Sequence, residues 1–153
     1  NTSLSWKGFD LSAIFAYSIG GYIYNRDITM ILHNGSLEGR DWSTEILKRW
    51  TPDNRNTDVP ALSTTTNNWN SASTRFLQNN SYMRLKNLTL SYNLPKQWIS
   101  KLSLSSVQVY VQGDNLFTIH RNQGLDPEQG ITGITYYRYP AMRTISGGIN
   151  VSF

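Results

Sequence analysis

The chain has 153 residues, which is long enough for one ordinary domain with its own core. Charged residues make up only 16% of the chain, and the formal net charge of +4 is spread without a run of Lys or Arg, so we expect no nucleic-acid partner. The absence of cysteine excludes disulfides and thiol chemistry, and no apolar run is long enough for a membrane-spanning helix.

The composition is typical of a transmembrane β-barrel. Aromatic residues make up 12% of the chain and include nine Tyr and five Trp, alongside abundant Asn, Ser and Thr. In such barrels aromatic side chains form girdles at the membrane interfaces and small polar side chains line the interior. The mean hydropathy of −0.43 does not argue against a barrel, because alternation halves the hydropathy of every strand. Since the chain starts at Asn1 without a signal peptide, we expect a mature or partial chain.

The first two predicted strands form a hairpin. Thr2 to Trp6 is the first strand, Lys7-Gly8 makes a two-residue turn, and an alternating strand runs from Phe9 to Ile23. Such a turn places Trp6 directly opposite Phe9, so the apolar sets of both strands share one face.

A long polar region follows from Asn25 to Asn80. Within it we predict one short helix, Asp41 to Trp50, with Asp41 as its cap and Pro52 after its end. Its apolar side would consist of Ile46, Leu47 and Trp50. The rest of this region is expected to be loop.

Alternation resumes in three more strands. Tyr82 to Leu94 is the third, with a disturbed phase at Met83 to Lys86 that indicates either a bulge or the point where the strand leaves the bilayer. A short helical turn from Pro95 to Leu102 leads to the fourth strand, Ser106 to Ile119. A loop from His120 to Tyr139 precedes the final strand, which alternates up to Phe153.

The joins between these strands alternate between short and long. In an up-and-down barrel, alternate joins lie on opposite sides of the membrane, and outer-membrane barrels have short periplasmic turns and long extracellular loops. We therefore predict an all-β fold of antiparallel up-and-down strands. Five strands cannot close a barrel, which needs at least about eight, so we expect the C-terminal part of a larger transmembrane β-barrel, with a long extracellular loop containing a short helix.

Several segments resemble the C-terminal end of the SusC/RagA family of TonB-linked outer-membrane receptors. The most specific pieces are YMRLKN at residues 82–87, NLFT at 115–118, LDPE at 125–128 and YPAMRTISGG at 139–148 with the terminal Phe153. Their order and spacing match together, and WKGFDL at residues 6–11 also resembles a hairpin of that family.

The resemblance implies a bacterial outer-membrane protein that is not an enzyme. It would be a barrel of about 22 strands with an N-terminal plug, importing oligosaccharides or peptides with a SusD-like lipoprotein and energised through TonB. Residues 1–153 would be barrel alone, with no plug domain. The implied partners are the SusD-like lipoprotein, TonB through the plug, the barrel-assembly machinery, the lipid bilayer and a glycan or peptide substrate.

Two sets of candidate functional residues follow. Ile149, Val151 and Phe153 resemble the C-terminal signal by which barrel-assembly machinery captures a final strand. Trp42, Trp50 and Trp69 could stack on sugar rings or contact the lipoprotein lid, although packing within the loop also explains them. We predict no catalytic, metal-binding or cofactor-binding residues.

Two readings from the residues stay open beside the barrel. A secreted, soluble β-sandwich that binds carbohydrate through the loop tryptophans explains the aromatic and polar content, but not the alternation of join lengths. Asp126 and Glu128 flank Pro127, where a turn directed by Asp-Pro competes with a calcium contact.

Overall fold

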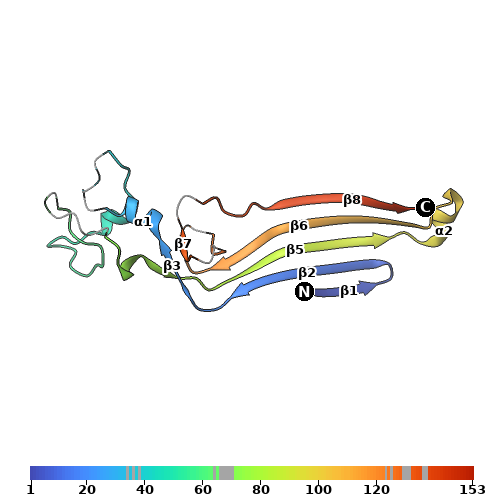
Figure 1. Cartoon of the computed structure of the whole chain (residues 1–153), viewed down its shortest axis with the longest axis horizontal. Coiled ribbons are helices and arrows are strands. Elements are labelled where there is room, and N and C mark those ends of the chain that lie inside the picture. Colours follow the sequence, from blue (N-terminus) through green and yellow to red (C-terminus); the bar gives the residue numbers. More distant parts are fainter. Residues whose placement is uncertain are drawn as a thin grey trace. The chain divides into compact units, whose positions relative to one another are not determined.

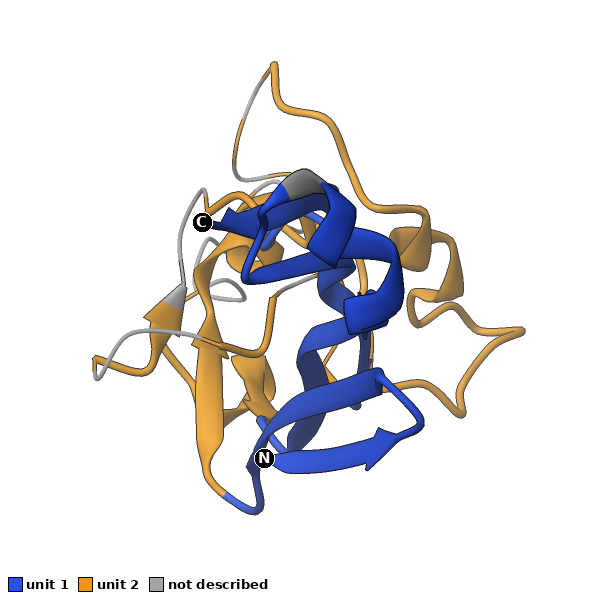
Figure 2. Ribbon diagram, turned by 90° about the vertical axis from the view of Figure 1, so that its right-hand side faces the viewer, with its two compact units in different colours: residues 1–20, 80–121, 140–153 blue, residues 21–79, 122–139 orange. Residues whose placement is uncertain are grey.

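The computed structural model describes residues 1–33, 35, 37, 39–63, 65, 71–122, 124, 126–128, 132–135 and 138–153. The chain divides into two units, coloured separately in Figure 2. Unit 1 comprises Asn1–Gly20, Asn80–Arg121 and Pro140–Phe153, and unit 2 comprises Gly21–Asn79 and Asn122–Tyr139.

Unit 1 contains a five-stranded antiparallel sheet in which the strands follow one another in chain order (Figure 1). The strands are β1 (Thr2–Trp6), β2 (Phe9–Ser18), β5 (Tyr82–Asn93), β6 (Ser106–His120) and β8 (Thr144–Ser152). Four of them are 9 to 15 residues long, which reaches or exceeds the roughly 9–11 residues with which a tilted strand crosses a bilayer. The predicted up-and-down arrangement of five strands is confirmed.

The short joins of the sheet lie at one end. Lys7 and Gly8 have φ values of 45° and 90°, which a two-residue turn matching the strand twist requires, and Trp6 pairs with Phe9 as predicted. The join between β5 and β6 contains α2 (Lys96–Ile99) and η3 (Ser100–Leu102), so the expected helical turn after Pro95 is confirmed. Figure 1 shows α2, the β1–β2 turn and the C-terminus at this same end of the sheet.

A bulge keeps the two faces of the sheet distinct. Asn87 pairs with Ile14 and Leu85 with Phe15, so Lys86 has no partner on β2. The extra residue reverses the alternation within β5, which places Met83 and Leu85 on the same face as Leu88 and Leu90. Of the two alternatives for the disturbed phase in the sequence, the structure therefore shows the bulge.

Unit 2 has a small core of its own. Its three-stranded sheet has the order β4 (Leu77–Asn79), β3 (Tyr22–Asn25) and β7 (Ile134–Thr135). The helices are α1 (Arg26–Ile31), η1 (Thr44–Lys48) and η2 (Thr74–Phe76). The buried apolar side chains are Ile23, Leu32, Ile46, Val59 and Phe76.

Two predictions about this region were wrong in detail. The strand expected from Phe9 to Ile23 ends at Ser18, because Gly20 and Gly21 have φ values of 83° and 77° that interrupt extended backbone. Ile23 instead belongs to the separate strand β3, where its side chain is fully buried.

The helix predicted from Asp41 to Trp50 is the shorter 3₁₀ helix η1. Its cap is Ser43, whose hydroxyl accepts a hydrogen bond from the Glu45 backbone N–H, and not Asp41. Ile46 is buried as expected, but Leu47 is 72% exposed, because so short a helix turns a single side chain into the core.

The β-sandwich alternative is also wrong. The five strands of unit 1 form a single sheet in chain order, and large side chains on its apolar face, such as Leu4 and Ile145, are exposed. Among the described residues, no helix combines the length and apolarity needed to cross a membrane.

Candidate functional site

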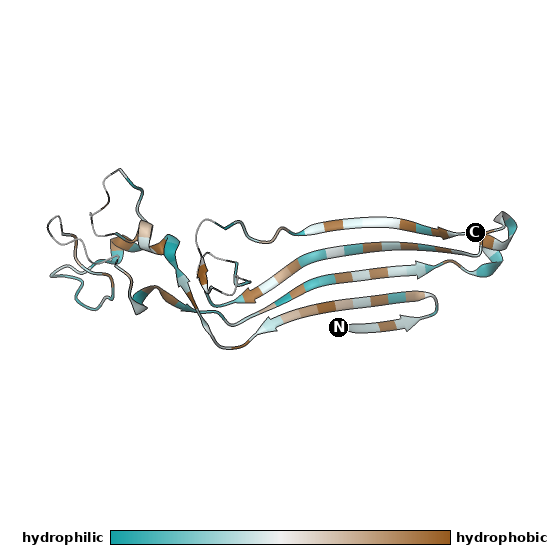
Figure 3. Ribbon diagram, in the orientation of Figure 1, coloured by the Kyte–Doolittle hydropathy of each residue, from teal (hydrophilic) through white to brown (hydrophobic). Residues whose placement is uncertain are grey.

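The candidate site is the five-stranded sheet, because its two faces differ in chemistry. Figure 3 shows apolar and polar bands alternating along β5 and β6. The pairing registers bring the apolar bands of neighbouring strands together, as in the rows Phe9–Tyr92–Val109–Ile149 and Leu11–Leu90–Val111–Gly147. One face is therefore apolar across the strands, and the other carries most of the polar side chains.

The apolar face is exposed across all five strands. Leu4 and Trp6 are each 65% exposed at one edge, and Ile145 is 72% exposed at the other. Exposed apolar areas of this extent mark a surface made for another apolar phase or a partner, since in water they promote aggregation.

The polar face near the short joins carries two sets of side-chain hydrogen bonds, each of which spans three strands. The Asp10 carboxylate on β2 accepts hydrogen bonds from Ser5 Oγ on β1 at 2.5 Å and from Asn93 Nδ2 on β5 at 2.7 Å. Farther across the sheet, Asn150 Nδ2 donates to Gln108 Oε1 at 3.2 Å, and Gln108 Nε2 donates to Ser91 Oγ at 3.3 Å. The two sets meet on β5, at Asn93 and Ser91, and between them involve side chains of all five strands.

A second group of polar contacts lies beside the bulge. Asn87 Nδ2 donates to Asp114 Oδ1 at 2.8 Å, and Gln112 Nε2 lies 3.2 Å from Asp114 Oδ2. Beyond the bulge, the buried Arg84 donates from Nε to Thr118 Oγ1 at 2.9 Å. Amides and hydroxyls outnumber charges here, which gives a wettable surface with little net charge.

The predicted assembly residues lie on the edge strand β8. Ile149 pairs with Val109 and Val151 with Val107, so both belong to the apolar face, where they are 64% and 44% exposed. Phe153 follows the last strand residue, Ser152, and is 91% exposed. The outer edge of β8 has no strand beside it in the described part of the chain, which leaves backbone groups for another strand to pair with.

An unpredicted feature of β8 is a glycine beneath an aromatic ring. Gly148 pairs with Tyr110 on β6, and a Cβ atom at Gly148 would lie 2.7 Å from Tyr110 Oη and 2.8 Å from Cζ. The tyrosine ring therefore covers the glycine on the polar face, an arrangement that pins strand register. The signal in the sequence was a glycine in a strand interior, which marks close approach of another group.

The predicted loop tryptophans do not form a common platform in the described residues. Trp42 Nε1 donates to Nδ1 of the buried His33 at 3.2 Å, with the two rings edge-to-face at 5.2 Å. Trp50 is 44% exposed, and its backbone N–H bonds to the Val59 carbonyl at 2.8 Å. Trp69 lies outside the described residues. Packing within the loop thus accounts for Trp42.

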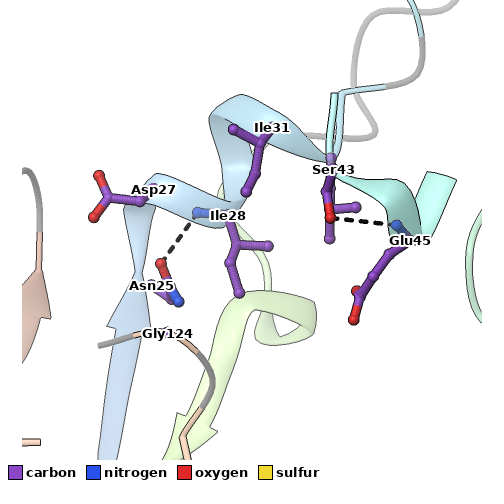
Figure 4. Close-up of a pocket in the computed structure, with 8 residues that line it drawn as sticks. Asn25, Asp27, Ile28, Ile31, Ser43, Glu45 and Gly124 are labelled. Atoms are coloured by element: carbon purple, nitrogen blue, oxygen red, sulfur yellow. Dashed lines mark hydrogen bonds between the residues drawn. The ribbon is translucent and has the colours of Figure 1, made fainter. Parts of the chain in front are cut away.

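Unit 2 contains a pocket of about 230 Å³ that the sequence did not predict (Figure 4). It lies beside α1, which begins where Asn25 Oδ1 accepts a hydrogen bond from the Ile28 N–H at 3.1 Å. Ile28, Ile31 and Leu32 make its wall apolar. An Asn cap followed by apolar residues three and four apart was the signal for α1.

The turn directed by Asp-Pro is confirmed. Asp126 Oδ1 accepts a hydrogen bond from the Glu128 N–H at 2.9 Å around the buried Pro127. This local bond is the one by which Asp side chains stabilise turns.

Comparison with known proteins identifies relatives of this two-faced sheet. No protein-family model matches the chain. TonB-dependent receptor P3 of Formosa agariphila is 34% identical over the whole chain and 16% of that receptor, and TonB-dependent receptor SusC of Bacteroides thetaiotaomicron is 27% identical over 99% of the chain and 14% of that receptor.

Solved structures agree with these relatives. The RagAB peptide importer in its "closed-closed" and "open-open" states matches with TM-scores of 0.84 and 0.85. The identity is 35% over 97% of this chain and 16% of that one. The chain is therefore homologous to SusC/RagA-type TonB-dependent receptors, which are outer-membrane transporters and not enzymes, and it matches about 16% of their length.

Proposed function

We propose that this chain forms part of the barrel wall of a SusC/RagA-type transporter in the bacterial outer membrane. The observation that carries the proposal is the two-faced sheet, apolar and exposed on one side and hydrogen-bonded through polar side chains on the other. Residues 1–153 would be the C-terminal barrel segment. The apolar face would contact lipid, and the polar face would line the lumen.

Lipid contact gives the exposed apolar face a favourable environment. A fully buried Leu, Ile, Val or Phe side chain stabilises a protein by about 1.5–3 kcal/mol relative to an exposed one. The exposed large side chains on this face, such as Leu4 at 65%, Leu11 at 39% and Ile145 at 72%, would gain this contribution only in an apolar phase. The wet lumen, in contrast, suits the amides and hydroxyls of the opposite face.

The joins support an orientation for this wall. The short joins, Lys7-Gly8 and the α2 connection, would face the periplasm, and the long joins that contain unit 2 would face outwards. Trp6, Phe9 and Tyr92 near the short joins would then belong to the inner aromatic girdle, where Phe9 and Tyr92 are in ring contact at 4.5 Å.

The complete receptor would supply the partners. Its outward loops would meet a SusD-like lipoprotein, its plug would contact TonB, and its barrel-assembly partner would read Ile149, Val151 and Phe153. The similarity to RagAB in both its closed and open states, with almost equal TM-scores, supports a static wall for this segment in place of a moving lid. The imported ligand would be an oligosaccharide or a peptide.

Nitroxide accessibility tests the two faces directly. The chain has no cysteine, so Leu11→Cys and Ser12→Cys place single labels on neighbouring residues of β2 that face opposite sides. In the complete receptor in lipid vesicles, with other cysteines removed, we expect oxygen to relax the label at 11 more strongly and a water-soluble nickel complex to relax the label at 12. Equal access of the nickel complex to both labels contradicts a lipid-facing wall.

The import function needs a separate test. A strain lacking the gene should lose growth on either oligosaccharides or peptides as the limiting nutrient, and restoring the gene should restore it. Unchanged growth and uptake on both nutrient classes contradicts the transport role while leaving the wall intact.

A further inference from the structure

A depression of about 310 Å³ interrupts the apolar face of the five-stranded sheet. It lies between two rows of paired residues, Leu11–Leu90–Val111 and Leu88–Gly113–Ile145. On the side away from the short joins it is closed by Leu116, which covers Gly113 so closely that an added Cβ atom there would lie 2.6 Å from Leu116 Cδ2. Leu11 and Ile145 in its wall are 39% and 72% exposed, so a ligand can reach this wall.

The end of the sheet that carries the short joins is rich in lysine. The two join segments, residues 7–8 and 94–105, contain Lys7, Lys96 and Lys101 and no acidic residue. All three lysines are exposed. The carboxylate closest to Lys7 in the sequence, Asp10, lies on the opposite, polar face, where it accepts two side-chain hydrogen bonds. The join segments therefore carry three positive charges beside the apolar face.

The Lys7 side chain reaches the apolar side of this end. Its ammonium nitrogen lies 5.0 Å from the centroid of the Trp6 ring, and Trp6 belongs to the apolar face through its pairing with Phe9. Phe9 in turn is in ring contact with Tyr92. A lysine beside a row of aromatic rings can hold its charge at the level of lipid headgroups while its stem covers apolar surface.

The depression lies within one leaflet of this aromatic row. Its two rows of residues lie opposite Leu11 and Ala13, which follow Phe9 by two and four residues. At about 3.4 Å per residue, these rows are about 7 and 14 Å from Phe9 along the strand. Half of a hydrocarbon core about 30 Å thick is about 15 Å, and the tilt of barrel strands reduces the depth further. An acyl chain whose headgroup lies at Lys7 can therefore extend into the depression.

We propose that Lys7 and this depression form a binding site for one anionic phospholipid of the leaflet that the short joins face. The lipid phosphate would accept hydrogen bonds from the Lys7 ammonium, Lys96 and Lys101 would add positive potential, and an acyl chain would fill the depression. A second copy of the chain suits the site less well, because two copies in one membrane share one orientation and would bring their lysines together. The inference rests on the proposed lipid-facing wall and adds a specific lipid to it.

Native mass spectrometry of the complete receptor in detergent measures bound lipid apart from import. The probes are phosphatidylglycerol, which is anionic, and phosphatidylcholine, which has no net charge, added in equal amounts and with the same acyl chains. We expect the wild-type receptor to retain phosphatidylglycerol at least about fivefold more often, the ratio that corresponds to about 1 kcal/mol for one lysine near a membrane surface.

Substitutions of lysine test the headgroup contact. Lys7→Gln should lower the preference for phosphatidylglycerol about fivefold, whereas Lys7→Arg keeps the positive charge and should retain the preference. Lys48→Gln is the matched control, because Lys48 is an exposed lysine of unit 2, outside the short joins, and its loss should change nothing.

A larger side chain in the depression tests the acyl-chain contact. Ile145→Trp should occupy part of the depression and lower the retention of phosphatidylglycerol. Ile119→Trp is the matched control, because Ile119 is 65% exposed on β6 outside the depression, and this change should leave retention as in the wild type. The gel shift of the folded receptor checks the barrel in each variant, and the lysine variants decide the inference even if a tryptophan variant fails to fold.

Equal retention of the two lipids by the wild-type receptor, or an unchanged preference in Lys7→Gln, overturns the site. Unchanged retention in folded Ile145→Trp, or an equal loss in Ile119→Trp, overturns it as well. If the nitroxide label at residue 11 faces lipid while both lipids are retained equally, the site fails and the wall stands. Access of the nickel complex to that label refutes the wall itself.

Discussion

The Tyr110 ring lies so close to Gly148 that we expect a methyl group at position 148 to destabilise the pairing of β8 with β6. In Gly148→Ala, the new Cβ would lie 2.7 Å from Oη, 2.8 Å from Cζ and 2.9 Å from Cε1 of Tyr110. These contacts are all with one side chain, so the ring must leave its position over the strand. Overpacking in a core costs about 1–3 kcal/mol. Because the displaced atoms are the outer end of one half-buried side chain, we expect the lower part of that range, about 1–2 kcal/mol. A loss of that size lowers the folded-to-unfolded ratio by about 5–30-fold.

A double-mutant cycle in the complete receptor separates this clash from a general effect of alanine. Tyr110→Ser removes the ring, so Gly148→Ala should cost much less in that background. The assay is the temperature at which the folded band of the detergent-solubilised receptor converts to the unfolded band on a gel. Gly147→Ala is the control on the same strand and opposite face, where the new Cβ would lie 3.3 Å from the Tyr110 carbonyl oxygen, and it should have the smaller effect.

Equal and additive losses for Gly148→Ala in both backgrounds would refute the reasoning, because the ring would then not be the group that the methyl displaces. A larger loss for Gly147→Ala than for Gly148→Ala would refute it as well.

Three further predictions concern other parts of the chain. Deleting Phe153 should lower the amount of heat-modifiable barrel in the membrane, measured by gel shift of outer-membrane fractions, and an unchanged amount would contradict its role in assembly. Burial lowers the pKa of His33 below its usual 6.5, so the unfolded chain binds more protons in the window below pH 6.5, and stability of unit 2 should fall as the pH drops through that window. Protonated His33 cannot accept the Trp42 N–H at Nδ1, and the emission of Trp42, isolated by replacing the other tryptophans, should change over that window in the wild type but not in His33→Gln. Asn25→Ala removes the cap from the Ile28 N–H and should destabilise α1 by about 1 kcal/mol, detectable as faster amide hydrogen exchange there, whereas Asn25→Asp should retain most of the protection.

The strands of unit 1 could be predicted from the sequence because apolar and polar residues alternate along a strand whose two faces meet different environments. The two-residue turn between Trp6 and Phe9 indicates the first hairpin, and the disturbed alternation before Asn87 indicates the bulge. These signals are local, since period two and turn chemistry are properties of neighbouring residues. The resemblance at residues 82–87 and 139–148 also led to the correct family.

Unit 2 could not be predicted in this way, because its apolar residues are not spaced at a regular interval. Whether Ser43 or Asp41 caps η1, and whether Ile46 or Leu47 is buried, depends on what the chain packs against. No sequence pattern indicated that His33 lies buried beside Trp42, as it does in the structure.

The strands of unit 1, their two faces and the resemblance to the family follow from spacing and motif along single stretches of the chain. The strands of unit 2 and the contacts between polar groups of different strands, such as Asp10 with Asn93, emerge only from the folded structure. Hydrogen bonding and burial depend on distances between residues that are far apart in the chain. Those distances are settled only when the sheet registers and the loop core form together.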